Sequence, residues 1–377
     1  MSPSPEKPGI FTYADFDLQA LCRHASMLRK GIPCACDPDQ RPASGSFNWA
    51  ILVSFEDQGE SFWQAKLPHC DTSELKVIFQ SPKYTIIGNA PSDTILPPSN
   101  VCSASANNEI GLPFILMSEA LGQPLSKAWR PASSPQPSLE TPSKAKVLSQ
   151  LGRITWNLAQ LRFDKIGSLF EENESFNIKE CLSRGHMMHE RFSLSIPRGP
   201  FTSKDEFYDS LISAFSEHAE VLPLSHHCFI APVPSQGEYP CKLQYENAVN
   251  LWNDFVTVGG KIDSADNRLD YIITGDALRE IIQKLELPAS NPETFPLYHP
   301  DLSVNNIYVD DDYNITCIID WAFASSIPES MLLTAPGLPQ YRDEISLELQ
   351  VSFIDGFIAA IPGPTEGEVV RRYRKSL

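Results

Sequence analysis

The sequence lacks any long apolar run. Among its 377 residues, no hydrophobic stretch approaches the roughly 20 residues that a membrane-spanning helix needs. The proline-rich segment 1–8 also lacks the apolar core of a secretory signal peptide. We therefore expect a cytoplasmic protein that does not contact a membrane.

Basic residues are in short supply. Lys and Arg together number 30 against 47 Asp and Glu, which gives a net charge of −17 at pH 7. We do not expect a nucleic-acid partner, because the phosphate backbone dominates such binding and requires a basic surface. The negative charge could attract a cationic small molecule, although solubility alone explains it more simply.

Paired cysteines are missing as well. Nine cysteines are scattered along the chain. The nearest two, Cys34 and Cys36, have neither the spacing of a zinc knuckle nor a second pair to complete one. An odd number of scattered thiols indicates a reduced, intracellular protein, so we expect free thiols and no structural zinc.

The apolar pattern that is present predicts an α+β protein. Hydrophobic residues make up 42% and charged residues 20% of the chain, as in ordinary globular proteins, while 32 prolines argue against a helical bundle. Two β-like runs at 50–55 and 61–67 predict an antiparallel hairpin, and the run 112–119 predicts a buried strand. The predicted helices span 11–31, capped by Asp15, then 144–162, 205–221, 245–258 and 275–287. Strands followed by helices predict two lobes of different class.

The stretch 299–321 contains the most informative pattern. A His-x-Asp triplet that ends at Asp301 is followed five residues later by Asn306. Two short apolar strands come next, joined by the acidic turn 310–314, and the second strand ends at Asp320. The predicted hairpin therefore brings two carboxylates and a carboxamide to one edge.

These three side chains suit phosphoryl transfer. The reaction requires Mg²⁺ held by oxygen ligands against a triphosphate, and a carboxylate that orients the attacking hydroxyl and accepts its proton. Asn306 and Asp320 suit the metal, and Asp301 suits the hydroxyl. Either aspartate could instead cap a turn or end a strand, but the joint pattern favours the catalytic interpretation.

The motif resembles the catalytic signature of the aminoglycoside phosphotransferase and choline kinase-like family, which has a protein-kinase-like fold. The signature consists of His299, Asp301 and Asn306, followed by Ile318-Ile319-Asp320-Trp321. Further segments that resemble the fungal phosphotransferases of this family are 44–48, 112–117, 161–169 and 328–330. The resemblance covers most of residues 12–345, apart from the segment 70–110.

The resemblance implies a two-lobed enzyme with ATP and Mg²⁺ as cofactors. A small antiparallel N-lobe would span residues 1–120, and a larger, mainly helical C-lobe would span residues 121–377. Asp301 would act as the catalytic base, and Asn306 and Asp320 would hold Mg²⁺.

The resemblance also assigns residues to the nucleotide. The cofactor-binding residues would be Lys66 on the α- and β-phosphates, Ser46 in a phosphate-side loop, and Met117 and Glu119 in the strand and hinge that receive adenine. His299 would have a structural role, bracing the catalytic loop.

The segment 70–110 departs from the family pattern. Kinase-like enzymes use a helix there to supply a glutamate that pairs with the lysine, whereas prolines at 82, 91, 97 and 98 exclude a long helix here. Glu74 is the only early candidate, and it lies on a strand-like run.

Two functions are therefore kept open. The first is an ATP-dependent kinase that acts on a hydroxyl of a small molecule. The alternative is a catalytically silent, kinase-like binding or scaffold protein with a degenerate N-lobe. A protein kinase fits less well, because Trp321-Ala322 stands where Phe-Gly would be expected. The acceptor and the oligomeric state cannot be read from the sequence.

A group of polar residues outside the motif invites comparison with a metal site. His186, His189 and Glu190 lack the His-Glu-x-x-His spacing of metalloproteases. We expect them on the solvated face of a helix.

Overall fold

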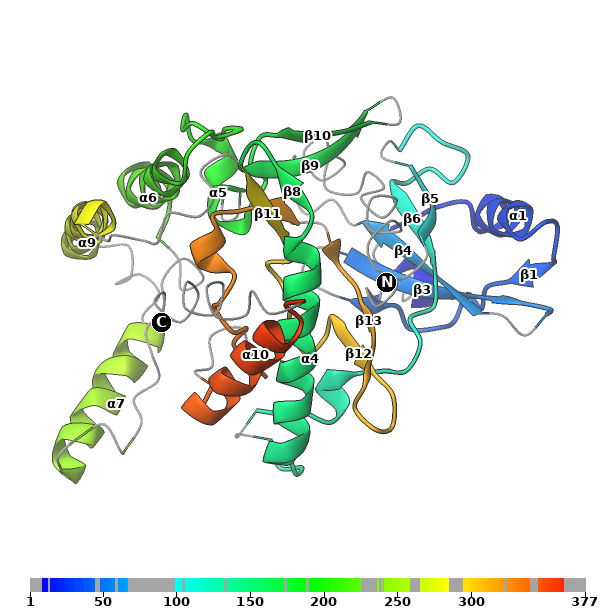
Figure 1. The fold of residues 1–377 in the computed structure, drawn as a ribbon. Helices are drawn as coiled ribbons and strands as arrows, with labels where there is room; N and C mark the ends of the chain where they lie inside the picture. Colours follow the sequence, from blue (N-terminus) through cyan, green and yellow to red (C-terminus); the bar gives the residue numbers. More distant parts are fainter. Residues whose placement is uncertain are drawn as a thin grey trace, which may run out of the picture. The chain divides into compact units, whose positions relative to one another are not determined.

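The computed structural model describes most of the chain (Figure 1). The described residues are 9–12, 14–44, 48–57, 60–66, 99–103, 106–131, 134–172, 175–187, 190–224, 236, 239, 241–257, 265–284, 294–321, 324–339 and 345–362. The chain divides into two compact units. The first comprises Met1–Arg162, Leu169–Ile178 and Pro296–Leu377, and the second comprises Phe163–Ser168 and Lys179–Phe295. The lobe boundary proposed at residue 120 lies inside the first unit and stays a prediction.

An antiparallel sheet opens the first unit. Its order is β1-β3-β4-β6-β5, with β2 also paired to β3. The strands are β1 (Cys34–Ala35), β2 (Ala43–Ser44), β3 (Asn48–Phe55), β4 (Glu60–Lys66), β5 (Ser99–Ser103) and β6 (Phe114–Ser118). The predicted hairpin is confirmed as β3 and β4, in which Ile51 pairs with Trp63. Ile51, Val53 and Phe55 are buried because alternate side chains of a strand point to the same face.

Helix α1 (Leu18–Leu28) belongs to the core of this sheet. Leu21 and Ala25 are buried in the same hydrophobic cluster as Ile51 and Val53. The helix begins later than the predicted residue 11, and the prediction that Asp15 caps it is wrong. Asp17 is the cap, because its carboxylate accepts a hydrogen bond from the Ala20 N–H at 2.8 Å.

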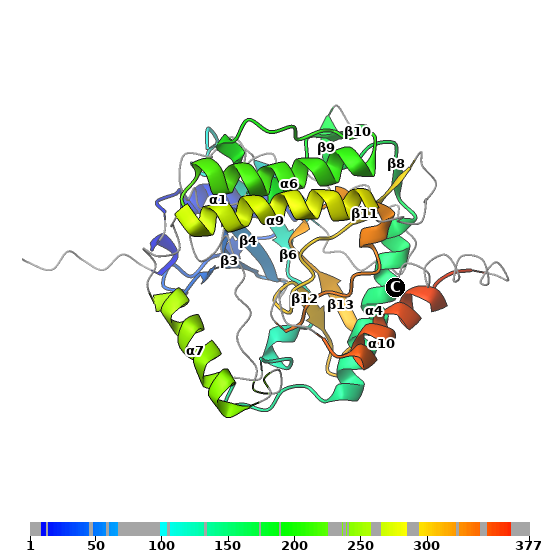
Figure 2. The same ribbon diagram turned by 90° about the vertical axis from the view of Figure 1, so that its left-hand side faces the viewer.

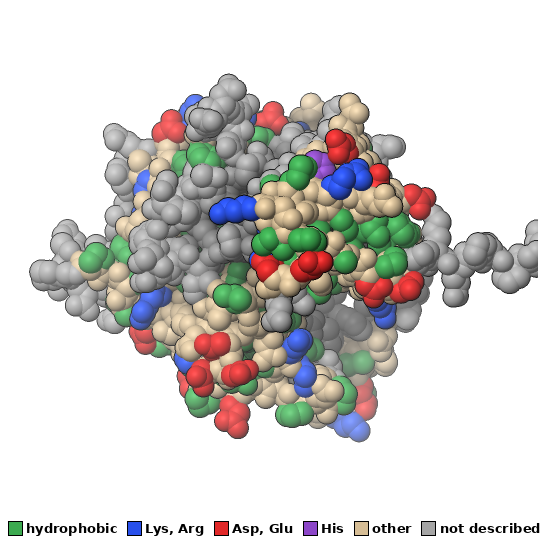
Figure 3. Space-filling view, turned by 90° about the vertical axis from the view of Figure 1, so that its right-hand side faces the viewer, with side chains coloured by type: hydrophobic (Ala, Val, Ile, Leu, Met, Phe, Trp, Pro, Cys, Tyr) green, Lys and Arg blue, Asp and Glu red, His purple; other side chains and the backbone are tan. Residues whose placement is uncertain are grey.

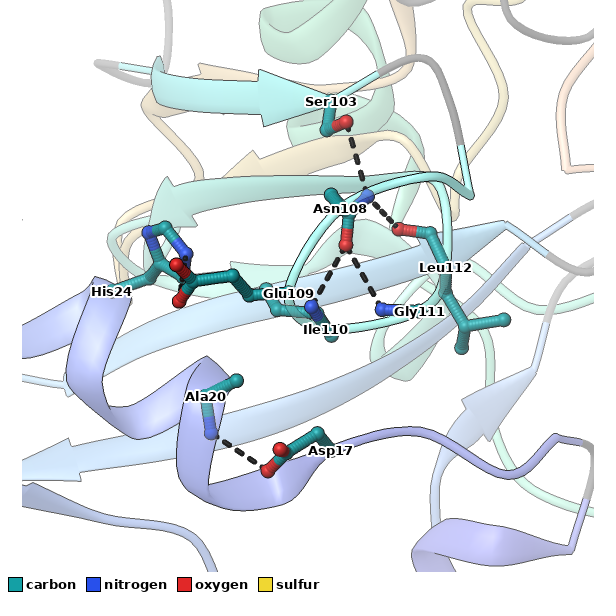
Figure 4. A network of polar contacts seen from close by, with 9 residues as sticks. All are labelled: Asp17, Ala20, His24, Ser103, Asn108, Glu109, Ile110, Gly111 and Leu112. Atoms are coloured by element: carbon teal, nitrogen blue, oxygen red, sulfur yellow. Dashed lines mark hydrogen bonds and ion pairs between the residues drawn. The ribbon is translucent and has the colours of Figure 1, made fainter.

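The turn before β6 is held by one side chain (Figure 4). The Oδ1 atom of Asn108 accepts hydrogen bonds from the N–H groups of Ile110 and Gly111, each at 2.9 Å. Its Nδ2 atom donates to the carbonyl of Leu112 at 2.7 Å and to Ser103 Oγ at 3.1 Å. The turn is therefore fixed to the end of β5, and its backbone leads directly into β6.

A second, three-stranded sheet has the order β13-β12-β7. It contains β7 (Gln123–Pro124), β12 (Ile307–Val309) and β13 (Ile315–Ile318), and it confirms the predicted hairpin around the acidic turn. Helix α4 (Thr141–Ala159) runs beside this hairpin in both ribbon views (Figures 1 and 2). Gln150 of α4 donates to the Tyr313 carbonyl and accepts from the Ile315 N–H, so the helix and the turn are joined.

Helix α10 (Leu347–Ala359) packs against α4 through two glycines. A Cβ atom added at Gly152 would lie 1.9 Å from the Phe353 carbonyl oxygen, and one added at Gly356 would lie 1.9 Å from the Ser149 carbonyl oxygen. The two helices therefore approach more closely than any side chain would allow.

A third sheet, mostly in the first unit, has the order β10-β9-β14-β11-β8. Its strands are β8 (Arg162–Phe163), β9 (Gly167–Glu172), β10 (Ser175–Lys179), β11 (Phe295–Tyr298) and β14 (Ser325–Ser326).

The second unit is helical. Among the described residues, its α-helices are α5 (Arg184–Met187), α6 (Lys204–Val221), α7 (Lys242–Thr257) and α9 (Ala265–Lys284). The short 3₁₀ helices in the described parts of the whole chain are Gly9–Phe11, Leu125–Lys127, Arg191–Ser193 and Glu329–Met331. Ser203 and Glu206 form a capping box at the start of α6. Helix α9 starts well before the predicted residue 275. It packs on α6, where Arg279 Nε lies 2.8 Å from Asp209 Oδ1.

The α+β class predicted from the sequence is confirmed by the antiparallel sheets and the separate helices. On the face drawn in Figure 3, acidic and basic side chains of the described residues are interspersed with apolar ones. Among the described residues, no helix has both the length and the apolar content that crossing a bilayer requires.

Candidate functional site

The loop before β12 is organised by His299. This side chain is fully buried, at 0% exposure. Its Nδ1 atom accepts a hydrogen bond from the Asp301 N–H at 3.1 Å, so the ring proton must be on Nε2. That Nε2–H donates to the Ile319 carbonyl at 3.1 Å. His299 is thus a neutral imidazole that joins the backbone of Asp301 to the residue before Asp320.

The side chain of Asn306 is oriented by the same loop. Its Nδ2 atom donates to the Asp301 carbonyl at 3.0 Å, and its own backbone carbonyl accepts from the Ile319 N–H at 2.9 Å. Because the amide nitrogen is used in this bond, the oxygen Oδ1 is the atom that Asn306 presents for a cation. The residue is buried, so its orientation is held by the fold.

Asp320 follows the end of β13 in an unusual backbone conformation. Its φ is +62°, in the left-handed region that non-glycine residues rarely adopt, although Asp and Asn tolerate it best. Trp321 holds the chain here. Its indole N–H donates to the Ile318 carbonyl at 2.9 Å, and its ring meets that of His299 edge-on with centroids 4.5 Å apart. Backbone strain of this kind is concentrated at functional sites in proteins.

The three predicted catalytic and metal residues are therefore linked through a few bonds in one unit. Asp301 is joined to Asn306 directly, and both connect through Ile319 to Asp320. In the part of the chain that the structure describes, no group of three or more His, Cys, Asp or Glu side chains could hold a metal ion. Mg²⁺ does not need such a group, because it is usually bound by one or two carboxylates together with phosphate oxygens and water. One amide oxygen and one carboxylate fit that ion.

The predicted nucleotide residues are described less completely. Lys66 ends β4 and pairs with Asn48, but its side chain lies outside the described residues, as does all of Ser46. Met117 is in β6, where it pairs with Phe62 of β4, so the lysine strand and the strand that leads to the hinge are neighbours. Glu74, the only early candidate for a glutamate that pairs with Lys66, lies outside the described residues.

Glu119 follows β6 and is half-buried. Burial, followed by the charges of Cys317 and Glu119, raises the pKa of Tyr308 in β12. The segment after β6 is bonded to this hairpin by Thr316, which sequence analysis did not single out, and it approaches the hairpin closely at Gly122. Gly122 could have been noticed as a glycine that follows the predicted strand at 112–119 and directly precedes β7.

The expectation that His186 lies on a solvated helix face is wrong. Its side chain is fully buried in the second unit, between Ser183 Oγ at 2.8 Å and Ser210 Oγ at 2.9 Å. Burial, followed by the charges of Arg198 and Arg191, lowers its pKa from 6.5 to about 4. Both ring nitrogens have hydroxyl partners, which is why a neutral histidine can be accommodated in this core.

Comparison with known proteins finds similar chains only among solved structures. No protein-family model and no curated protein matches the chain. Among solved structures, the chain is similar to a macrolide 2′-phosphotransferase of Brachybacterium faecium, with 11% identity, 95% of this chain and 89% of that chain covered, and a TM-score of 0.42. It is also similar to an ethanolamine kinase of Plasmodium vivax, with 14% identity, 89% and 70% coverage, and a TM-score of 0.46.

A third similar structure is an amicoumacin kinase in complex with AMP-PNP and Ca²⁺, with 11% identity, 96% and 84% coverage, and a TM-score of 0.40. At such identities and TM-scores, any function has to be argued from the residues of the site itself.

Proposed function

We propose that this protein is an ATP-dependent phosphotransferase that acts on a hydroxyl group of a small molecule. The observation that supports the proposal is the bonded loop around these residues: the Asn306 side chain donates to the Asp301 carbonyl, and Ile319, the residue before Asp320, is bonded to both Asn306 and His299. Asn306 and Asp320 would hold Mg²⁺, which supplies positive charge against the phosphates of ATP.

Asp301 takes the role of catalytic base. Its carboxylate would accept the proton of the acceptor hydroxyl while the hydroxyl oxygen bonds to the γ-phosphorus and the bond to the β-phosphate oxygen breaks. ADP would then leave with that oxygen. Burial of the loop around His299 supports this role, because a base is effective only when its position is fixed.

The nucleotide would lie between β4 and the segment after β6. Lys66 would contact the α- and β-phosphates, Ser46 would lie on the phosphate side, and Met117 and Glu119 would flank the adenine. The adjacency of β4 and β6 supports this arrangement, since it brings the lysine strand beside the hinge strand.

The test is thermal unfolding with ATP and Mg²⁺, with Asp320→Asn compared with Asp311→Asn. Asparagine tolerates the left-handed backbone of position 320, so the substitution removes the charge without imposing a new strain. Asp311 is an exposed residue of the turn in the same hairpin and serves as the matched control. We expect the wild type and Asp311→Asn to be stabilised by about 5 °C at a nucleotide concentration of roughly 100 times Kd, and Asp320→Asn not to be stabilised.

A second variant separates binding from catalysis. Asp301→Asn should retain Mg²⁺-dependent binding of ATP while turnover of a hydroxyl acceptor falls at least about 100-fold. If ATP and Mg²⁺ did not stabilise the wild type, the proposal would be wrong, and the catalytically silent binding or scaffold protein would be the better description. If Asp301→Asn turned over normally, Asp301 would not be the base.

A further inference from the structure

The segment that follows β6 is paired to the hairpin of β12 and β13. Strand β7 runs antiparallel to β12, with Val309 opposite Gln123 and Tyr308 opposite Pro124. Further along, the Ser126 N–H donates to the Val304 carbonyl at 2.9 Å. The proposed hinge is therefore an additional edge strand of the sheet that carries the proposed metal ligands.

One side-chain bond fixes the start of this pairing. The hydroxyl of Thr316, on β13, donates to the carbonyl of Leu121, which lies two residues after Glu119. Thr316 lies in β13, four residues before Asp320, which is the second residue after that strand. This hydroxyl thus adds a side-chain bond between the proposed adenine side of the site and its proposed metal side.

Beside this bond, the segment after β6 cannot approach the hairpin more closely, and position 122 cannot accommodate a residue larger than glycine. Gly122 has a φ of +91°. A Cβ atom added there would lie 2.4 Å from the Val309 carbonyl oxygen and 2.8 Å from Thr316 Oγ1. Because backbone atoms block one side, the spacing between the hinge and the hairpin is set by direct contact, and Thr316 holds the two surfaces in that contact.

We propose that Thr316 is a positioning residue that sets the spacing between the adenine-binding strand and the metal-binding hairpin. The proposal rests on the function proposed above and adds to it a specific coupling. With Mg²⁺, Asn306 and Asp320 would hold the phosphates through the metal while the hinge holds the adenine, so both ends of the nucleotide would have to fit the protein at once, and the Thr316 bond would keep the spacing that this requires. Without Mg²⁺ the phosphates would not be held by the hairpin, and the spacing would have little effect on binding.

The experiment measures the Kd of a fluorescent ATP analogue in Mg²⁺ and in EDTA for the wild type, Thr316→Val and Thr316→Ser. Valine keeps the β-branched shape that suits a strand and removes only the hydroxyl. We expect the ratio of the Kd in EDTA to the Kd in Mg²⁺ to fall about 3- to 10-fold in Thr316→Val, as the loss of one hydrogen bond predicts, with the Kd in EDTA nearly unchanged. Thr316→Ser should restore most of the ratio.

The control is Thr274→Val in α9 of the second unit. The Thr274 hydroxyl also donates to a backbone carbonyl, that of Asp270, at 2.7 Å, and its substitution should leave the ratio unchanged. If the wild type bound no nucleotide, or bound it without regard to Mg²⁺, the proposed function would fail. If the wild type did show the Mg²⁺ effect, an unchanged ratio in Thr316→Val, or equal weakening in Mg²⁺ and in EDTA, would overturn the role of Thr316 alone.

Discussion

At the scale of single residues, hydrogen-bond partners fix the chemical form of the two most informative histidines. His299 must carry its proton on Nε2, because Nδ1 receives the Asp301 N–H. His186 carries its proton on Nε2 and donates it to Ser210 Oγ, because the Ser210 hydroxyl itself donates to the Pro197 carbonyl, while Nδ1 accepts from the Ser183 hydroxyl. Both side chains are fully buried, yet His299 connects the proposed base to the proposed metal ligand, whereas His186 stabilises the second unit.

The first prediction concerns the pH dependence of stability. In the unfolded chain His186 takes up a proton near pH 6.5, whereas in the folded chain its pKa is lowered to about 4. Between these values the unfolded state binds more protons, so the free energy of unfolding falls as the pH is lowered from 6.5 to 4. The expected loss is about 2 to 3 kcal/mol. It is measured by urea unfolding at pH 7.5 and pH 4.5.

Comparison of variants isolates this effect from the titration of carboxylates. His186→Gln should lose that part of the pH dependence, although it is less stable at pH 7.5. His24→Gln should keep it, since the His24 side chain is one-third exposed, at 32%, and belongs to α1. An identical pH dependence in the wild type and His186→Gln would contradict the prediction.

At the scale of elements, the crossing of α4 and α10 determines where the hairpin is held. The two helices meet at Gly152 and Gly356. Gln150 of α4 forms two hydrogen bonds with the backbone of the hairpin, at the turn and at the start of β13. A displacement of α4 would therefore also displace β13, the strand that leads to Asp320.

The second prediction tests this crossing. Gly152→Ala should lower the free energy of unfolding by about 1 to 3 kcal/mol, because the added methyl group would meet the Phe353 backbone carbonyl, which cannot rotate away. Gly275→Ala in α9 is the matched control. There the nearest atom is the Ser216 hydroxyl, which can rotate, and alanine favours the helix by up to about 1 kcal/mol. The free energy of unfolding of both variants is measured with urea. Equal losses in the two variants would show that the close approach of α4 and α10 does not cause the destabilisation of Gly152→Ala.

At the scale of the whole molecule, all residues of the proposed site belong to one of the two units. Lys66, Met117, Glu119 and the residues of the 299–320 stretch fall within the first unit, although they are separated by more than 200 positions in the sequence. The second unit, with α6 and α9, contributes none of them.

The third prediction follows from this division. Hydrogen–deuterium exchange with ATP and Mg²⁺ should show slower exchange in peptides covering 114–126 and 299–320, because a ligand stabilises the residues that must be folded to bind it. Peptides from α6 and α9 should be unchanged by nucleotide alone. In Asp320→Asn the slowing at 299–320 should disappear. Protection confined to α6 and α9 would contradict the assignment of the site to the first unit.

The sequence by itself determined the α+β class, the hairpin of β3 and β4, and the order of residues around the proposed catalytic hairpin. These features are local: alternation of apolar residues specifies a strand, and a short acidic turn joins two neighbouring strands. The positions of Asp301, Asn306 and Asp320 in the chain therefore predict a common edge; the structure bonds the Asn306 side chain to the Asp301 backbone, and the catalytic and metal roles stay predictions.

Only the tertiary structure decided the features that depend on contacts distant in sequence. The cap of α1 is Asp17 and not Asp15, because its backbone N–H is bonded to the Ile110 carbonyl in the distant turn before β6, which fixes where the helix begins. His186 is buried because Ser183 and Ser210 meet it from two elements. Thr316 reaches Leu121 across 195 positions, a separation at which no pattern of neighbouring residues carries information.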